Sequence, residues 1–177
     1  MDGSRRDRTV ANVSTIRRRA YSGATLRSMV AYMDYLERRA VRYVQPFGGF
    51  GDWLAIEPTN SMLTNTAYSA YDALIMEQVA KRLGKDADQR RFRTFYENVK
   101  RSFNDLFVNE EGRTFAPTVE SIFGKDSQVG MWPGTAATEA KIVDTQTSYV
   151  VPLQFDLFNE KKQTLGDPAS GREYQET

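Results

Sequence analysis

The chain has 177 residues, of which 40% are apolar and 27% charged, a composition typical of one globular domain large enough to bury a core. Lysine and arginine total 24 against 23 aspartate and glutamate residues, so the near-neutral charge gives no reason to expect nucleic acid or an anionic membrane as a partner. The absence of cysteine and histidine excludes disulfides, thiolate nucleophiles, imidazole bases and the common metal sites built on those ligands, and no cofactor is expected.

Any acid–base chemistry in this chain must therefore use Asp, Glu, Tyr or Lys. No run of about 18 apolar residues is present, so no membrane span is expected, and the first residues lack the apolar core of a secretory signal. The compartment stays undetermined, with a periplasmic or extracellular location open.

Residues 1–24 are expected to form a poorly ordered basic segment, because residues 1–20 hold six arginines and few large apolar side chains. A nucleic-acid-binding arm is the alternative, but no aromatic residues are interleaved with these arginines. From Leu26 onward a helix is predicted, ended by Pro46. Its apolar stripe recurs every three or four residues: Leu26, Met29, Met33, Leu36, Ala40 and Tyr43.

The loop after this helix, Gly48-Gly49-Phe50-Gly51-Asp52-Trp53-Leu54-Ala55, has the composition of a sugar platform. Glycines allow a tight turn and a close ligand approach. An indole at Trp53 offers a flat apolar face to a pyranose, and the Asp52 carboxylate accepts hydrogen bonds from hydroxyls. The alternative interpretation is that Trp53 is a core anchor.

Two further helices are predicted to form an antiparallel hairpin. The first runs from about Met62 to Leu83, with Pro58-Thr59-Asn60-Ser61 supplying caps and Gly84 as a left-handed C-terminal residue. It is apolar on more than one side, and Tyr68 and Tyr71 are expected to pack between helices. The second begins at Asp86, whose side chain is expected to cap it together with Gln89.

The remainder of the chain is predicted to be less regular. Residues 108–115 indicate a small hairpin or loop, and residues 116–141 a long insertion, containing Trp132, that serves a binding face. A helix is predicted from about Asp144-Thr145, with Asp144 as its cap and Pro152 kinking or ending it. Another helix is predicted near Asn159, and residues 166–177 form a disordered tail.

Helices joined alternately by tight turns and long loops predict an all-α fold, with antiparallel hairpins forming part of a helical toroid. The motifs now described are, in chain order, Gly51-Asp52-Trp53-Leu54-Ala55, Ala67-Tyr68, Ala80-Lys81-Arg82-Leu83-Gly84-Lys85, Val99-Lys100-Arg101-Ser102-Phe103-Asn104, Thr145-Gln146-Thr147-Ser148-Tyr149 and Val151-Pro152-Leu153. In that order and spacing they resemble the catalytic domain of bacterial α-L-rhamnosidases, inverting glycoside hydrolases with an (α/α)6 barrel. The resemblance covers about Leu26 to Thr164, and residues 25–165 are assigned to a partial domain of that kind.

The resemblance implies that Trp53 lines the pocket for a terminal rhamnose and that Asp52 is its polar neighbour, with Trp132 and Gln146 as further substrate-binding residues. For Trp132 a loop core, and for Gln146 a hydrogen bond at a helix start, are the structural alternatives. Neither the general acid nor the general base of the family is found, so the catalytic residues are expected outside this chain. Asp52 and Glu57 are the nearest carboxylates, but Glu57 precedes helix caps, where an acidic residue is structurally favoured.

The sequence therefore predicts a fragment of a glycoside hydrolase that in intact form removes terminal non-reducing α-L-rhamnose with inversion. On this interpretation the fragment supplies sugar contacts without the catalytic pair and is inactive alone. The alternatives are a non-catalytic helical module that binds carbohydrate or protein through residues 116–141, and a fragment of another helical-toroid glycosidase or lyase.

Overall fold

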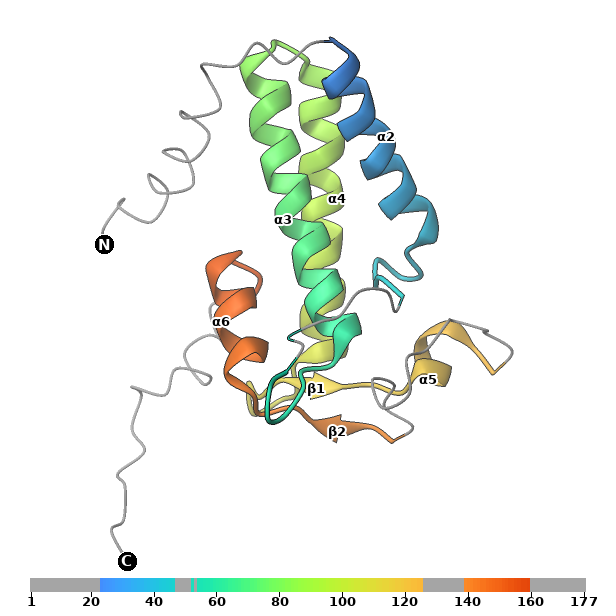
Figure 1. The fold of residues 1–177 in the computed structure, drawn as a ribbon, viewed down its shortest axis with the longest axis vertical. Coiled ribbons are helices and arrows are strands. Elements are labelled where there is room, and N and C mark those ends of the chain that lie inside the picture. The colour runs from blue at the N-terminus through green and yellow to red at the C-terminus, as the bar shows by residue number, and fades with distance from the viewer. Residues whose placement is uncertain (1–22, 47–51, 53, 126–138, 160–177) are drawn as a thin grey trace, which may run out of the picture.

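The computed structural model describes residues 23–46, 52, 54–125 and 139–159, and these residues are mainly helical (Figure 1). The basic segment expected at residues 1–24 lies outside this part except for Gly23 and Ala24, which begin a helix. The residues after Asn159, where a further helix is expected to begin, and the tail 166–177 also lie outside the described residues. The elements are α2 (Gly23–Arg39), α3 (Ser61–Arg82), α4 (Asp86–Phe107), β1 (Phe115–Ala116), α5 (Val119–Phe123), β2 (Lys141–Ile142) and α6 (Gln146–Gln154).

The α3–α4 hairpin forms as predicted and is the centre of the fold. Asn60 caps α3 by accepting hydrogen bonds from the backbone N–H groups of Met62 and Leu63. At the other end Gly84 is left-handed, with φ of 65°, and the N–H of Lys85 reaches back to the Ala80 carbonyl at 2.9 Å. This is a Schellman closure, in which glycine avoids the steric cost of positive φ. The three-residue link, Leu83 to Lys85, then returns α4 antiparallel to α3 (Figure 1).

The core lies between α3 and α4, with α2 and α6 flanking the hairpin (Figure 1). Apolar side chains of α4 recur at helical spacing and are buried: Phe92, Tyr96, Val99, Phe103 and Phe107. On α3 the facing positions are small, so the two helices approach closely; these are Ala67, Ala70 and Ala73. The predicted capping of α4 by the Asp86 side chain is wrong, because Lys85 occupies the N-cap position and makes no side-chain cap bond.

The first helix ends earlier than predicted. Helix α2 stops at Arg39, because Arg42 and Tyr43 adopt φ of 53° and 62° in a tight turn. Val41 and Val44 exchange both backbone hydrogen bonds across that turn, at 3.0 and 2.9 Å. Tyr43 therefore does not continue the apolar stripe of α2, and its side chain is exposed.

The segment between α4 and α6 contains more structure than predicted. Val108 pairs with Thr114 across a short turn, which confirms the expected small hairpin. Strand β1 pairs antiparallel with β2, Phe115 facing Ile142, at the end of the bundle where α3 begins (Figure 1). Helix α5 interrupts the insertion predicted at residues 116–141, with Thr118 accepting from the Ser121 N–H.

Helix α6 is capped by Thr145, so the prediction that Asp144 caps it is wrong. Asp144 instead accepts hydrogen bonds from Arg113 Nη2 and Tyr149 Oη, both at 2.7 Å. Pro152 lies within the helix, which ends two residues later at Gln154. The C-terminus of α6 has the same Schellman hydrogen bonds as that of α3, but Asp156, with φ of 56°, occupies the left-handed position that Gly84 occupies after α3.

Two side chains of α4 hold the segment that follows α6. Tyr96 Oη donates towards the carbonyls of Phe155 and Asp156, at 3.1 and 2.8 Å. Asn104 Nδ2 donates to the Leu157 carbonyl at 2.7 Å, and its Oδ1 accepts from the Asn159 N–H at 3.0 Å. The buried polar groups of this turn are therefore satisfied by α4, which fixes α6 against the hairpin. None of the described helices is long and apolar enough to cross a membrane.

Candidate functional site

The candidate site lies at the end of the bundle where α3 and α6 both begin (Figure 1). Here Asp52, in the segment before α3, approaches residues just before α6 through shared hydrogen bonds. We name this group, Asp52, Thr59, Thr145 and Gln146, the Asp52 site. It brings together two motifs that are about ninety positions apart in the sequence.

Among the described residues, Thr59 makes the two closest hydrogen bonds to Asp52. Its Oδ1 accepts from the Thr59 backbone N–H at 2.9 Å, and its Oδ2 accepts from Thr59 Oγ1 at 2.6 Å. Burial alone would raise the pKa of Asp52, but the hydrogen bonds from Thr59 and from the Thr147 side chain outweigh it and hold the pKa below its ordinary value. Asp52 is therefore an anion at neutral pH and an acceptor of hydrogen bonds.

The hydrogen bonds at this site run in one direction. Thr59 Oγ1 carries one hydrogen and donates it to Asp52, so in its 2.5 Å contact with Thr145 Oγ1 the Thr145 hydroxyl must be the donor. Thr145 Oγ1 in turn accepts from the backbone N–H of Ser148, at 3.3 Å, in the first turn of α6. The hydrogen bonds thus run from the N-terminus of α6 through Thr145 and Thr59 to the Asp52 carboxylate. The positive end of the α6 dipole therefore faces the negative charge of Asp52.

A second, buried layer supports Thr145. Thr114 and Ser148 are fully buried, and their hydroxyl oxygens are 2.8 Å apart. The Thr114 hydroxyl donates to the Val143 carbonyl, and the single hydroxyl hydrogen of Ser148 is shared between the Val143 and Thr145 carbonyls, at 2.9 and 2.7 Å. The backbone that carries Thr145 is therefore held by the strand-like segment before α6, and Thr145 itself is buried.

The other predicted site residues are placed only in part. Gln146 is the first residue of α6 and is exposed to solvent beside Thr145. Trp53 and Trp132 lie outside the described residues. Glu57 is exposed and makes no described contact with Asp52. Asp52 and Gln146 are thus brought to one end of the bundle, with the Asp52 carboxylate oriented by Thr59.

This arrangement can accept hydrogen bonds from a polyol but is poorly suited to donate a proton. The lowered pKa keeps Asp52 ionised at neutral pH, whereas a general acid must be protonated there. The carboxylate has about four acceptor sites, so the hydrogen bonds from Thr59 and Thr147 still leave room for a ligand hydroxyl. Among the described residues no cluster of three or more metal-binding side chains is present.

Replacing Asp52 with asparagine is expected to lower the free energy of unfolding at pH 7 by about 1–2 kcal/mol, because the amide keeps only one acceptor oxygen for the two Thr59 donors. The folded-state pKa of Asp52 is lowered, so its stabilisation is present above the unfolded pKa and is lost as pH falls through the folded value. Urea unfolding between pH 2 and 7 should show this acid dependence weakened in the variant. Glu57→Gln, at an exposed position, is the control; an equal effect there would contradict the role of Asp52.

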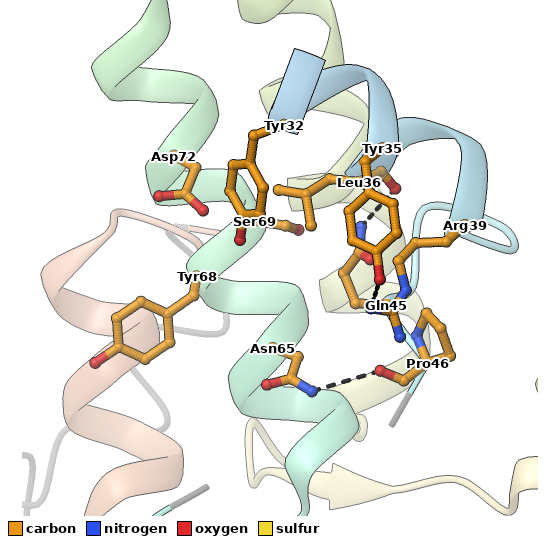
Figure 2. A pocket seen from close by; sticks show the side chains of 10 residues that line it. All are labelled: Tyr32, Tyr35, Leu36, Arg39, Gln45, Pro46, Asn65, Tyr68, Ser69 and Asp72. Carbon is orange, nitrogen blue, oxygen red and sulfur yellow. Dashed lines mark hydrogen bonds between the residues drawn. The ribbon is translucent and has the colours of Figure 1, made fainter. Parts of the chain in front are cut away.

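A second hollow lies between α2 and α3, and no residue of the Asp52 site lines it (Figure 2). Its volume is about 140 Å³, and tyrosine, amide and charged side chains line it: Tyr32, Tyr35, Arg39, Gln45, Asn65, Tyr68, Ser69 and Asp72. Burial raises the pKa of Asp72 to about 6. Arg39 lies across the pocket from Asp72 and donates to Tyr35 Oη at 2.6 Å (Figure 2).

Sequence reasoning missed Thr59 as the residue that holds Asp52, and it missed Asp72. The sequence predicts Thr59 as one of the capping residues of α3, and its position seven residues after Asp52 gives no local signal of their contact. An acidic residue within the otherwise apolar and small residues around Ala70 and Ala73 could have drawn attention to Asp72. Only the folded arrangement shows that it is half-buried.

The bacterial alpha-L-rhamnosidase 6 hairpin glycosidase domain family matches the chain over residues 20–169. An alpha-L-rhamnosidase of Streptomyces avermitilis is 30% identical over 94 residues, which are 52% of this chain and 9% of that protein. An alpha-L-rhamnosidase of Formosa agariphila is 26% identical over 127 residues, which are 67% of this chain and 11% of that protein. The chain thus spans about a tenth of the length of these relatives.

Two solved structures share the fold. The crystal structure of the Streptomyces avermitilis alpha-L-rhamnosidase complexed with L-rhamnose is similar with a TM-score of 0.59 and 24% identity, over 80% of this chain and 11% of that one. The alpha-L-rhamnosidase of Dictyoglumus thermophilum gives a TM-score of 0.56 and 24% identity, over 77% of this chain and 13% of that one. These similarities confirm the predicted all-α, six-hairpin fold class.

Proposed function

Because the chain belongs to the family of bacterial alpha-L-rhamnosidase 6 hairpin glycosidase domains, we propose that its Asp52 site binds the terminal α-L-rhamnose of a glycoside. The chain is a fragment of a glycoside hydrolase domain of this family. The observation that carries the proposal is the hydrogen-bonded link from Asp52 through Thr59 to Thr145. It joins the Gly-Asp-Trp motif to the Thr-Gln-Thr motif at one end of the bundle.

The chemistry of the site supports a sugar as its ligand. The anionic Asp52 accepts hydroxyl hydrogens, and the exposed Gln146 amide both donates and accepts. Trp53 follows Asp52 directly in the sequence, and an indole suits the apolar face of a deoxy-hexose with its C5 methyl group. The solved Streptomyces avermitilis relative holds L-rhamnose. We assign Asp52, Trp53, Trp132 and Gln146 to substrate binding on this basis.

Hydrolysis in the intact protein is proposed to proceed with inversion, through an acid and a base that this chain does not supply. Inversion requires two carboxyl groups about 6.5–9.5 Å apart, one protonated and one ionised. Asp52 remains ionised with both oxygens engaged by Thr59, which suits a substrate contact and not a proton donor. The chain alone is therefore expected to bind rhamnose weakly and to leave an aryl α-L-rhamnoside intact.

Titration of the chain with L-rhamnose is expected to change its tryptophan fluorescence, with a dissociation constant in the millimolar range, on the order of 4 kcal/mol of binding free energy. Trp53→Ala should abolish the response, because it removes the proposed aromatic wall. Trp132→Phe is the matched control, since it leaves Trp53 as the single reporter and should retain part of the signal.

Three outcomes would change the assignment. A full response in Trp53→Ala would place sugar binding elsewhere, and no response in the unaltered chain would favour the non-catalytic helical module. Release of the aryl group by the purified chain would show that a catalytic pair lies within these 177 residues.

A further inference from the structure

Thr145 makes two hydrogen bonds that join the start of α6 to the Asp52 site. Its Oγ1 accepts from the Ser148 backbone N–H at 3.3 Å, which caps α6, and lies 2.5 Å from Thr59 Oγ1. Because the Thr59 hydrogen goes to Asp52, the Thr145 hydroxyl is the donor in the second bond. A hydroxyl has one hydrogen and two lone pairs, so Thr145 can make both bonds at once. Thr145 therefore connects a helix terminus to the carboxylate that is proposed to bind the sugar.

Both threonines are enclosed by protein, with Thr59 4% and Thr145 8% exposed. A buried hydroxyl keeps its orientation through its protein partners, because bulk water has little access to replace them. The Thr145 hydrogen occupies an acceptor site on Thr59 Oγ1, and the Thr59 hydroxyl donates to Asp52 Oδ2 at 2.6 Å. The Thr59 backbone N–H holds Oδ1 at 2.9 Å. The orientation of the carboxylate thus depends on the side-chain rotamer of Thr59, which the Thr145 hydroxyl fixes.

The burial of Thr145 also limits what this residue can contact. Its side chain offers almost no surface to a sugar, whereas the next residue, Gln146, is exposed. The Thr147 side chain also hydrogen-bonds to Asp52 and helps to lower the pKa of that carboxyl. The first turn of α6 therefore acts on Asp52 through two threonines, directly from Thr147 and by way of Thr59 from Thr145.

We propose that Thr145 is a positioning residue for sugar binding: its hydroxyl holds Thr59 in the rotamer that orients Asp52, and it thereby couples the sugar site to the first turn of α6. This inference rests on the proposed binding of rhamnose at Asp52, and it assigns no sugar contact to Thr145 itself. Because coupling between two sites is reciprocal, a sugar bound at Asp52 must also stabilise the first turn of α6.

The alternative is that Thr145 only stabilises α6, since threonine at an N-cap stabilises a helix wherever it occurs. The chain offers a matched control in Thr118, which caps α5 from the same extended backbone conformation and accepts from the Ser121 N–H at 3.2 Å. Among the described residues, the side-chain hydrogen bond of Thr118 stays within its own helix turn. Loss of the Thr118 hydroxyl therefore removes a threonine cap without changing the Asp52 site.

The test compares Thr145→Val, Thr145→Ser and Thr118→Val in the full chain, by tryptophan fluorescence with L-rhamnose at pH 7 and by NMR titration of the Asp52 carboxyl. Thr145→Val should weaken rhamnose binding about fivefold, because Asp52 loses its fixed orientation. It should also raise the pKa of Asp52, since the hydrogen bond from Thr59 to the ionised carboxylate weakens. Thr145→Ser keeps the hydroxyl and should restore both values, and Thr118→Val should change neither. Because Asp52 is ionised at pH 7, weaker binding there reports orientation and not protonation.

A measurement on the unaltered chain keeps the proposal falsifiable if Thr145→Val does not fold. L-rhamnose at ten times its dissociation constant should slow hydrogen exchange of the Ser148 amide at least about threefold, because the sugar stabilises the turn that this amide caps. The Ser121 amide, which bonds to the Thr118 cap of α5, should exchange at the same rate with and without the sugar.

Unchanged rhamnose binding or an unchanged Asp52 pKa in Thr145→Val overturns the proposal, as does an equal effect in Thr118→Val or a failure of Thr145→Ser to restore the values. Equal exchange of the Ser148 amide with and without bound sugar overturns it as well. If the unaltered chain shows no response to L-rhamnose, the assignment of the sugar is wrong. A raised Asp52 pKa in Thr145→Val would then still support the positioning of this carboxylate, and an unchanged pKa would overturn it.

Discussion

Replacing Phe103 with alanine is expected to lower the free energy of unfolding by about 3–5 kcal/mol, the largest effect of any single substitution considered for this chain. Phe103 is fully buried at the end of the hairpin near the Asp52 site. Its ring lies 5.3 Å from that of Phe107 and 6.0 Å, edge to face, from that of Phe158. Removal leaves a cavity between α4 and the segment after α6, because Phe107 and Phe158 are fixed by their own packing and cannot fill it.

The measurement is urea unfolding followed by circular dichroism at 222 nm. Phe103→Leu retains most of the volume and should cost roughly 1–1.5 kcal/mol. Leu83→Ala, at a side chain that is 53% exposed, should change the stability by less than about 0.5 kcal/mol. A loss below 1 kcal/mol in Phe103→Ala would mean that the contact between α4 and the segment after α6 is not part of the cooperative core.

Asn104→Leu is expected to lower the free energy of unfolding by roughly 2–4 kcal/mol, although leucine has a similar size and is apolar. Asn104 is almost completely buried and satisfies the Leu157 carbonyl and the Asn159 N–H, at 2.7 and 3.0 Å. Leucine leaves the buried Leu157 carbonyl without a partner in a place that water does not reach, and it removes the acceptor of the part-buried Asn159 N–H. The loss of stability therefore comes mainly from the backbone groups left without a hydrogen-bond partner, and it exceeds the net contribution of the two hydrogen bonds themselves.

Hydrogen exchange gives a local readout of the same substitution. The Asn159 amide should exchange faster in Asn104→Leu, while amides in the middle of α3 keep their relative protection. Asn98→Ala is the matched control, because the Asn98 amide bonds to Tyr43 Oη at an exposed position. Equal losses for Asn98→Ala and Asn104→Leu would show that burial of the amide is not the cause.

The hairpin of this fold could be predicted from local sequence signals. The apolar periodicity of α4, the cap at Asn60 and the glycine at position 84 each act within a few residues, and the structure confirms all three. The end of α2 could not be predicted in this way. Ala40 and Tyr43 continue the apolar spacing, which predicts a longer helix. Arg42 and Tyr43 instead adopt left-handed conformations, and neither arginine nor tyrosine is a residue type that predicts positive φ.

The choice of cap for α6 shows a second limit of local reasoning. Asp144 and Thr145 are both good capping residues, and aspartate is the stronger by propensity. In the structure Asp144 bonds to Arg113 and Tyr149, so Thr145 takes the cap position. The side chain of Asp144 could bond either to the first turn of α6 or to these two partners, and the partners prevail. One of them, Arg113, lies thirty-one positions away in the sequence.

The candidate site was found through resemblance more than through periodicity. The Asp52 and Gln146 motifs suggested a common site because the family places them in that order, and the structure brings the two segments together through Thr59 and Thr145. The substrate-binding roles of Asp52, Trp53, Trp132 and Gln146 remain predictions. The partial burial of Asp72 depends on which residues pack around it, so no local pattern could have revealed it.

The one-way order of hydrogen bonds at Asp52 limits the chemistry of any group that approaches it. Thr59 gives its only hydroxyl hydrogen to the carboxylate, and Thr145 gives its own to Thr59, so neither threonine can offer a hydrogen to a newcomer. Any ligand atom within hydrogen-bonding distance of the carboxylate must therefore be a hydrogen-bond donor. A free hydroxyl meets that condition. An ether oxygen or a methylated hydroxyl has no hydrogen to donate, and an acidic substituent would be repelled by the negative charge of Asp52, so none of these is expected to bind there.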